Sequence, residues 1–264
     1  MLLEWLQLVG IRCDASARKL GYARAEVSLW SRARRCHATW APHHANTRAF
    51  VESLLSGFPA GGTCWVLGAG LLDDVPLAAL SARFDRVLLA DISFTRATWR
   101  ELSSLPRCEP RLFDATGIVA PLADWQPGQA LPMPRAQLHL DATAPALVLS
   151  LNLLSQLPLL PLEWLERHGV ALAERQAYGR RILQAHLAAL RGLACPVGLV
   201  TDFRRIFRNR AGEAVMSESA LLDVSPPVAE QEWSWTLAPL GEIDRQTSLD
   251  LRVLATRDLS PFPA

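Results

Sequence analysis

The sequence predicts an α/β protein with a mostly parallel, doubly wound sheet. From residue 61 onwards short apolar runs alternate with helical stretches, and this alternation favours a parallel sheet with helices on both faces. The first run ends in Gly68-Ala69-Gly70 and the second ends in Asp91. Strand, glycine turn, helix, strand and carboxylate, in that order, are typical of a nucleotide-binding βαβ unit. A chain of 264 residues is long enough for one such domain with a large core.

The expected elements follow one another closely after residue 60. The predicted strands are Cys64–Leu67, Arg86–Ala90, Pro110–Phe113, Ala146–Leu151, Val197–Thr201, Glu232–Ala238 and Leu249–Thr256. The predicted helices are Pro76–Ala82, Phe94–Leu105, Leu162–Arg167 and Ala171–Leu193. No helical pattern separates the last two strands, so we expect the seven-stranded sheet to end in an antiparallel pair.

Residues 1–60 are expected to form an N-terminal helical cap or lid, separate from a domain of residues 61–264. The spacing of apolar residues predicts helices over residues 2–9, 16–35 and 46–58. A Pro-Ala-Gly-Gly sequence then ends the last of these before the first strand.

Composition narrows the class of protein. A net charge of +1 provides no field that would attract nucleic acid, so neither nucleic acid nor membrane is an expected partner. Five cysteines without a Cys-x-x-Cys pair argue against a zinc ribbon or a disulfide framework, and no metal is expected. No signal peptide or membrane-spanning segment is recognisable, which favours a cytoplasmic protein. The dominance of arginine over a single lysine is typical of a GC-rich bacterial genome.

The residues after the glycine turn indicate which nucleoside ligand fits. A dinucleotide site has a third glycine where this chain has Asp73, and a carboxylate there would repel a pyrophosphate. The same acid suits S-adenosylmethionine (SAM), which carries positive charge and no phosphate. Asp91 can accept hydrogen bonds from both ribose hydroxyls, since Ser93 is the expected cap of the following helix.

At these positions the chain resembles the class I SAM-dependent methyltransferases. The resemblance lies in four apparent strand ends, which are Val66-Leu67-Gly68-Ala69-Gly70, Leu88-Leu89-Ala90-Asp91, Arg111-Leu112-Phe113-Asp114-Ala115-Thr116 and Leu147-Val148-Leu149-Ser150-Leu151-Asn152. It covers roughly residues 61–259 and implies a Rossmann-like fold with SAM as cofactor. The family usually has an acid at the position of Val66, and Asp73 or Asp74 is the candidate to replace it.

The resemblance and the strand ends together nominate cofactor-binding residues. Asp114 is expected at the adenine amino group, although a helix-cap or turn role explains it equally well. The full expected set is Gly68, Gly70, Asp73, Asp91, Ile92, Asp114, Ala115 and Asn152.

Other polar and aromatic residues are candidates for the methyl-acceptor side. Asn152 and Gln156 follow the most hydrophobic strand, where open α/β sheets bind ligands. The segment 36–48 holds Trp40, His37, His43 and His44. It is interpreted as a lid, as a solvated helix entry capped by Asn46, or least well as a metal site. In the lid interpretation a histidine acts as general base, and His43 and His37 are the catalytic candidates with Asn152.

Two further segments are assigned with simpler alternatives beside them. An arginine-rich stretch after the fifth predicted strand could hold an acidic substrate through Arg204, or be a solvated face. Trp233 and Trp235 alternate in one strand, share a face, and are expected in the core or in the wall of the substrate pocket.

The leading interpretation is a SAM-dependent methyltransferase that acts on a small molecule or peptide. The alternatives are a non-catalytic SAM- or nucleoside-binding protein with the same fold and a nicotinamide-dependent oxidoreductase. The missing third glycine and the terminal strand pair count against the oxidoreductase. The sequence assigns no oligomeric state.

Overall fold

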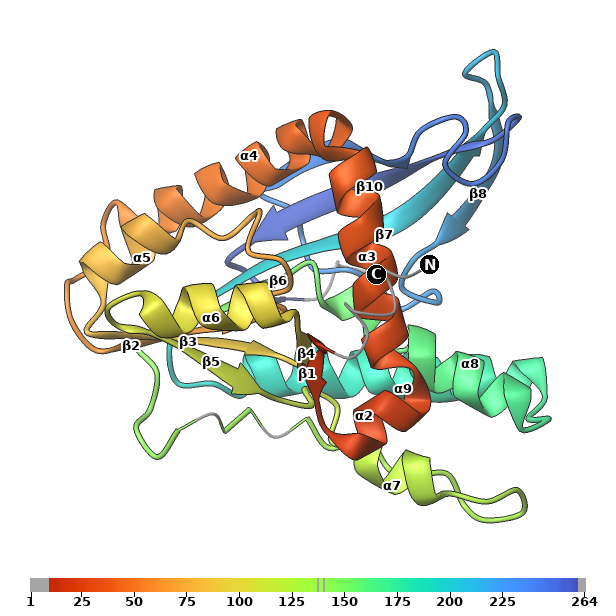
Figure 1. Ribbon diagram of the computed structural model, residues 1–264, viewed down its shortest axis with the longest axis horizontal. Helices are drawn as coiled ribbons and strands as arrows, with labels where there is room; N and C mark the ends of the chain where they lie inside the picture. Colours follow the sequence, from red (N-terminus) through yellow and green to blue (C-terminus); the bar gives the residue numbers. More distant parts are fainter. Residues whose placement is uncertain (1–9, 137, 140, 261–264) are drawn as a thin grey trace.

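The computed structural model describes residues 10–136, 138–139 and 141–260, and Figure 1 labels its elements. The strands are β1 (Arg12–Cys13), β2 (Thr63–Leu67), β3 (Arg86–Asp91), β4 (Ser93–Phe94), β5 (Cys108–Leu112), β6 (Leu147–Leu151), β7 (Val197–Arg208), β8 (Ala214–Ser219), β9 (Gln231–Ala238) and β10 (Ser248–Thr256). The helices are α2 (Ala15–Leu20), α3 (Tyr22–Arg35), α4 (His37–Leu55), α5 (Leu77–Arg83), α6 (Arg96–Ser104), α7 (Val119–Asp124), η1 (Leu154–Gln156), α8 (Leu159–Arg167) and α9 (Leu172–Arg191). None of these helices is both long and apolar enough to cross a bilayer. The helix expected over residues 2–9 lies outside the described residues.

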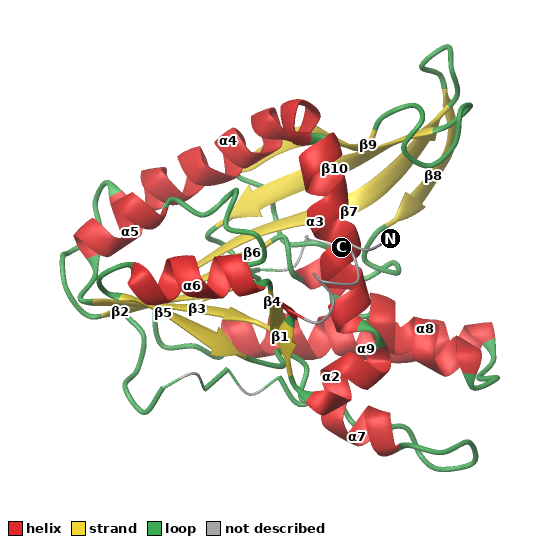
Figure 2. Ribbon diagram, viewed as in Figure 1, coloured by secondary structure: helices red, strands yellow, loops and turns green. Residues whose placement is uncertain are grey.

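The central sheet has the predicted fold class. Seven strands form one path in the order β5-β3-β2-β6-β7-β10-β9, and β8 pairs with β7 beside it. The strands from β5 to β7 are parallel, whereas β10 is antiparallel to both β7 and β9. The sheet therefore ends in the expected antiparallel pair, as in the class I methyltransferase fold that the sequence resembles (Figure 2).

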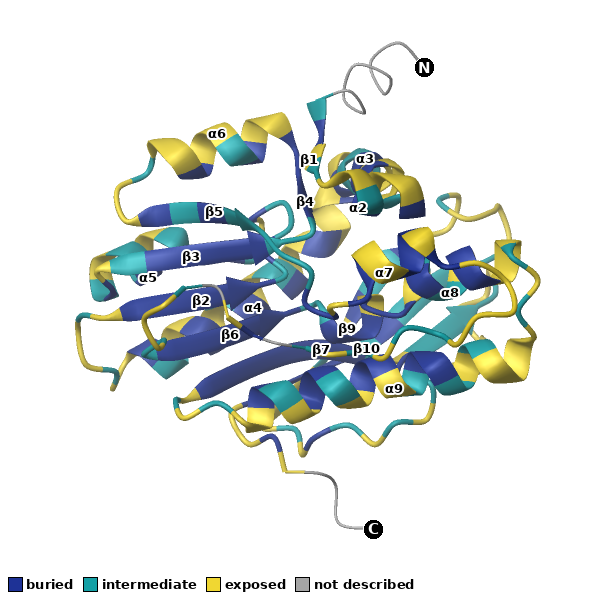
Figure 3. Ribbon diagram, turned by 90° about the horizontal axis from the view of Figure 1, so that it is seen from below, coloured by how far each residue is buried: buried dark blue, intermediate teal, exposed yellow. Residues whose placement is uncertain are grey.

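Two hydrophobic cores lie on opposite faces of this sheet. Trp65 and Leu67 of β2 pack with residues of α2, α7, α8 and α9 on one face. Cys64 and Val66 pack with residues of α4, α5 and α6 on the other. The alternation arises because successive side chains of a strand point to opposite faces. Figure 3 shows the central parallel strands as largely buried, as helices on both faces require.

A short strand pair outside the main sheet positions the N-terminal helices. β1 pairs antiparallel with β4, with Arg12 opposite Phe94 and Cys13 opposite Ser93. Because β4 directly follows β3, the pairing holds α2 and α3 beyond the carboxyl end of β3, where Figure 3 shows them. The guanidinium of Arg12 also lies over the ring of Trp99, 4.7 Å from its centroid.

Helix α4 differs most from the expected N-terminal elements. It joins the histidine-containing segment to the helix expected over 46–58, so Asn46 lies inside the helix and does not cap it. Phe50 and its apolar neighbours in the second half of α4 are buried against the sheet. That half belongs to the core, and the first half extends to the ligand-binding edge. The division into residues 1–60 and 61–264 stays a prediction.

The fifth strand of the main sheet is longer than predicted. It does not end at Thr201 but continues to Arg208, which pairs with Ser248 at the far end of β10. β8 pairs with the same extension, and Asn209 Oδ1 closes the turn by accepting the Glu213 amide at 3.0 Å. The arginine-rich segment is thus an extended hairpin rather than a loop.

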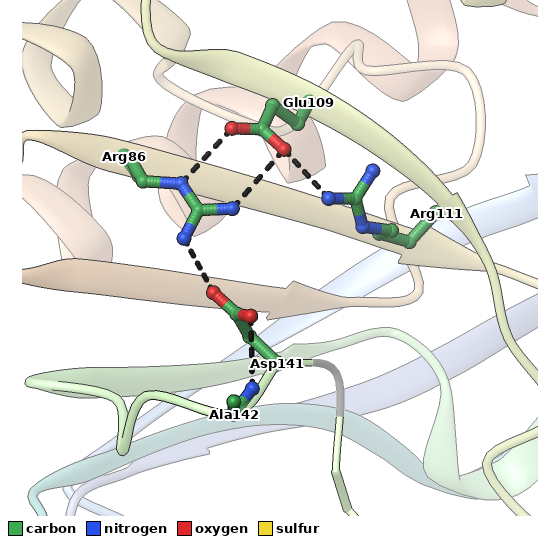
Figure 4. Close-up of polar contacts among 5 residues, drawn as sticks. All are labelled: Arg86, Glu109, Arg111, Asp141 and Ala142. Carbon is green, nitrogen blue, oxygen red and sulfur yellow. Dashed lines mark hydrogen bonds and ion pairs between the residues drawn. The ribbon is translucent and has the colours of Figure 1, made fainter.

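Ion pairs connect the long loop before β6 to the amino ends of β3 and β5 (Figure 4). Arg86 Nε donates to Glu109 Oε1 at 3.0 Å, and another nitrogen of the same guanidinium binds Asp141. Arg111 donates to Glu109 at 2.7 Å. Hydrogen bonds from Arg86 lower the pKa of both carboxyls. The network lies at the opposite end of β3 from Asp91 and is a structural tether.

Replacing Gly68 by alanine is expected to destabilise the protein more than replacing Gly212. Both glycines are left-handed, with φ of 79° and 81°, so either alanine carries a strain of roughly 1–2 kcal/mol. A Cβ at Gly68 would also lie 2.6 Å from the carbonyl oxygen of Leu151, whereas at Gly212 it meets nothing within 4 Å. This clash should add about 1–3 kcal/mol. Chemical denaturation measures the free energy of unfolding of both variants. Equal losses in Gly68→Ala and Gly212→Ala would contradict the prediction.

Candidate active site

A cavity of about 290 Å³ opens at the carboxyl ends of β2, β3 and β6, bordered by α3 and the first half of α4. This edge is where open α/β sheets bind ligands. Of the residues predicted from the sequence, the cavity is lined by Gly68, Gly70, Asp73, Asp91, Ile92, Ala115, Asn152, Trp40, His43, His44 and Gln156.

The glycine turn after β2 is held against both neighbouring strands. The Gly68 amide donates to the carbonyl of Ala90 at 2.9 Å, and the Gly70 amide donates to Asp91 Oδ2 at 2.8 Å. Gly68 approaches Leu151 at the end of β6 so closely that only glycine fits there. The turn therefore places backbone, without side chains, along one wall of the cavity.

Asp91 ends β3 with its carboxylate oriented by main-chain donors. Besides the Gly70 amide, the Ile92 amide donates to Oδ1 at 2.7 Å. Burial raises the pKa of Asp91, and these amide donors oppose the rise. The Ser93 amide lies 3.5 Å from the same Oδ1. Each carboxylate oxygen accepts about two hydrogen bonds, so a position remains on Oδ2 for a ligand. Asp91 is not a helix cap, since Thr95, and not the expected Ser93, caps α6 by accepting the Thr98 amide.

A second polar group faces the cavity from the opposite side of β2. Asn152 directly follows β6 and has a left-handed backbone, with φ of 49°. Its Nδ2 donates to Asp74 Oδ2 at 2.6 Å. Within the described part of the chain the buried Oδ1 of Asn152 has no partner. Burial raises the pKa of Asp74, while Asn152 and the nearby His44 oppose the rise. The pair offers acceptors to a ligand that brings N–H donors or positive charge.

The histidine that lines the cavity deepest is not in the state that a general base needs. His43 Nδ1 accepts a hydrogen bond from Trp233 Nε1 at 3.0 Å. The imidazole stacks on Trp235 with centroids 3.9 Å apart. Burial, and then His44, lowers the pKa of His43 to about 3. The ring is therefore neutral with its hydrogen on Nε2, so it donates and does not accept a proton, contrary to the expected role.

His44 is the histidine better suited to accept a proton. It is half-exposed in the wall of the cavity, beside the acids of the glycine turn. Burial lowers the pKa of His44, and the charges of Asp74 and Asp73 oppose the change. A neutral imidazole next to carboxylates can take up a proton and keep it stabilised.

Three predicted site residues lie away from the cavity. His37 is exposed at the start of α4. Asp114 accepts hydrogen bonds from the Thr116 amide and the Val119 amide, both at 2.8 Å, so it has the turn role and does not face a ligand. Arg204 is exposed on β7, where its guanidinium donates to a serine of β8. Arg204 thus has the position of the solvated face that was the alternative to a substrate-binding role, because β7 extends beyond Thr201.

Some cavity residues were not nominated from the sequence. Glu26 and Tyr22 reach the cavity from α3, and Leu29 follows one turn later. Glu26 is the only acid in the arginine-rich stretch 16–35, and that isolation was the available signal. Trp235, which was expected either in the core or in a pocket wall, lines the cavity.

Within the described residues, no three His, Cys, Asp or Glu side chains gather in a way that could hold a metal ion. The histidines of α4 instead contact aromatic rings and one another.

No family model matches the chain and no curated protein sequence matches it. The solved structures similar to it include magnesium protoporphyrin IX methyltransferase from Synechocystis PCC 6803 with bound SAM, at TM-score 0.36 and 13% identity, covering 80% of this chain and 79% of that one. A Haemonchus contortus phosphoethanolamine N-methyltransferase in complex with phosphoethanolamine and S-adenosylhomocysteine matches at TM-score 0.35 and 13% identity, covering 83% and 44%. The glycopeptide N-methyltransferase MtfA with SAM matches at TM-score 0.34 and 13% identity, covering 79% and 76%. At these values the matches carry no conclusion about ligand or activity.

His43 is expected to remain neutral and protonated on Nε2 between pH 5 and 8. The ¹⁵N chemical shifts of its two ring nitrogens report this directly. Trp233→Phe removes the donor to Nδ1 and should produce a mixture of tautomers, while Trp30→Phe on α3 should leave the shifts unchanged. A His43 that titrates near pH 6.5 in the wild-type protein would contradict this arrangement.

Proposed function

We propose that the protein is a SAM-dependent methyltransferase that acts on a small molecule or a peptide. The observation that carries the proposal is the pair of acidic groups that flank β2 in one cavity. Asp91 lies at the end of β3, and Asp74 is bonded to Asn152 at the end of β6. With strands ~4.8 Å apart, the ends of β3 and β6 are roughly 10 Å from each other.

The end of the cavity at Asp91 suits a ribose and an adenine. The carboxylate has an acceptor position left on Oδ2 for a ribose hydroxyl. Ile92, Phe113 and Ala115 provide apolar surface close to it, which fits the faces of a purine ring. Among the residues that the structure describes, no lysine or arginine lines the cavity, so a pyrophosphate would meet carboxylates without a counter-charge. These features favour SAM over a nicotinamide dinucleotide.

The end at Asp74 suits the methionine part of SAM. An α-ammonium would give donors to the Asp74 carboxylate and to the unpartnered Oδ1 of Asn152. A positive ligand would also offset the cost of burying Asp74. Asp74 would in this way replace the acid that the family usually has at Val66, which here is fully buried in the sheet core.

The acceptor side of the cavity is bounded by α4 and β9. Trp40 and the stacked pair of His43 and Trp235 form an aromatic wall, and Gln156 and Leu159 extend it from the segment after β6. The wall suits a substrate with an apolar or planar part. His43 Nε2 is a fixed hydrogen-bond donor there.

The chemistry that fits is direct methyl transfer. SAM supplies an electrophilic methyl group on its sulfonium. The chain's residues orient the two reactants and exclude water, and such positioning accounts for much of the rate in reactions of this kind. His44 is the group placed to remove a proton from the acceptor, and Asp74 and Asp73 would stabilise the resulting imidazolium.

A non-catalytic protein that binds SAM is the second candidate, favoured by the apolar Val66 at the position of the usual acid. Turnover separates the two candidates. Incubation with SAM and a low-molecular-weight cell extract should release S-adenosylhomocysteine, and Asp91→Asn should slow the release when SAM is limiting. Tight binding of SAM without release from any small-molecule or peptide fraction would support the non-catalytic alternative.

Substitutions of Asp91 and Asp74 should weaken the binding of different parts of the ligand. Asp91→Asn is expected to weaken the binding of S-adenosylhomocysteine and of 5′-methylthioadenosine alike, by about 1.5–3 kcal/mol, the range for a hydrogen bond to a charged group. Asp74→Asn should weaken only S-adenosylhomocysteine, because methylthioadenosine lacks the amino-acid part. Calorimetry with both ligands measures this. Equal effects of Asp74→Asn on the two would place the methionine end elsewhere.

His44→Gln should lower kcat about 10²-fold or more, the lower limit for loss of a general base, without changing the affinity for S-adenosylhomocysteine. His37→Gln is the matched control, since His37 is on the same helix but outside the cavity. An unchanged kcat in His44→Gln would exclude it as the base.

A further inference from the structure

Helix α3 contributes a carboxyl group to the cavity at the end where Asp91 lies. Glu26 is 6% exposed and lines the cavity together with Asp91 and Ser93. The pairing of β1 with β4 brings α3 to this position, so the acid comes from the N-terminal segment and not from the sheet.

One oxygen of this carboxyl has a partner and the other has none. The Ser93 hydroxyl donates to Glu26 Oε2 at 3.2 Å. Oε1 is buried and has no hydrogen-bond partner within the described residues. Native proteins leave few buried polar atoms unpaired, and this one lies in the wall of a cavity, where a ligand can reach it.

The surroundings of Glu26 favour its uncharged form. Burial, followed by repulsion from Asp91, raises the pKa of Glu26 to about 8, and the Ser93 hydroxyl opposes the rise. The other titratable groups near it are the Cys13 thiol on β1, whose pKa Glu26 helps to raise, and Tyr22 one turn earlier on α3. At neutral pH the side chain is thus a carboxylic acid, with one O–H to donate.

Asp91 and Glu26 are therefore complementary partners at one place. Asp91 accepts main-chain hydrogen bonds on both carboxyl oxygens and is therefore an acceptor, whereas the protonated Glu26 has one hydrogen to donate. A hydroxyl group both donates and accepts, so a hydroxyl between them satisfies both carboxyls. Two carboxylates would instead repel each other there.

We propose that Glu26 is the second carboxyl of the ribose site, where its protonated Oε1 donates to a ribose hydroxyl oxygen whose own hydrogen Asp91 accepts. The inference rests on the proposed function, since it takes the ligand to be SAM. It assigns α3 a direct role in cofactor recognition. It also makes cofactor affinity dependent on a proton carried by the protein, because an ionised Glu26 would have no hydrogen to give.

The test is the affinity for 5′-methylthioadenosine, which lacks the titrating α-amino group of S-adenosylhomocysteine, measured by calorimetry from pH 6.5 to 9.5. Wild-type affinity should fall above the pKa of Glu26, approaching tenfold per pH unit, because only the protonated form binds well. Glu26→Gln keeps a neutral donor, so it should bind like wild type at pH 6.5 and lose this pH dependence. Glu26→Ala should bind about 3- to 10-fold more weakly at pH 6.5, the loss for one hydrogen bond. Glu101→Gln, at an exposed position of α6, is the matched control.

Two outcomes would overturn the proposal. One is a Glu26→Gln variant with the same pH slope as wild type, and the other is unchanged affinity at pH 6.5 in Glu26→Ala. If Glu26→Ala does not fold, as thermal unfolding would show, the pH slope of Glu26→Gln still decides. A wild-type protein that does not bind S-adenosylhomocysteine, or binds it equally well as Asp91→Asn, would overturn the proposed function as well.

Discussion

The hydrogen bond from the Gly70 amide to the Asp91 carboxylate joins the glycine turn to the end of the neighbouring strand. The rest of the ligand-binding edge depends on it. The turn cannot move away from β3 without breaking this bond, and it cannot move toward β6 because Gly68 already touches Leu151. Backbone from β2, a carboxylate from β3 and Asn152 from β6 are thereby held in one place. Rigid placement of this kind is what group transfer between two bound molecules requires.

Charge is distributed unevenly around the cavity. Glu26, Asp73, Asp74 and Asp91 line it, and no lysine or arginine does so within residues 10–136, 138–139 and 141–260. Burial raises the pKa of Glu26, Asp74 and Asp91. Such a site is unfavourable when empty, since each buried carboxyl must give up either hydration or its charge. A ligand that brings hydroxyls to one end and positive charge to the other relieves both costs. The same carboxyl groups that would repel a pyrophosphate therefore favour a ligand with hydroxyls and a positive charge.

The sequence was informative where the relevant contacts are local, and less so where they cross the fold. Asp91 and the glycine turn could be predicted, because neighbouring strands of one βαβ unit bring them together. Glu26 could not be selected, since only the β1–β4 pairing brings α3 to that edge. The two alternatives for Arg204 could not be separated from the sequence, because the length of β7 is set by its pairing with β10, late in the chain. The state of His43 depends on Trp233, which lies 190 residues further along.

The hydrogen bond between Trp233 and His43 connects the terminal strand pair to the wall of the cavity. β10 runs antiparallel between β7 and β9, and β9 therefore lies beside α4, where Trp233 and Trp235 meet His43. Trp40 also donates from its indole to the carbonyl of Leu237 in β9, at 3.0 Å. The first half of α4 is thus anchored to the sheet by hydrogen bonds and stacking. In the proposed methyltransferase, an acceptor wall fixed in this way would select a substrate by its shape and through one donor of constant protonation, and the partly exposed His44 beside it would be free to exchange a proton.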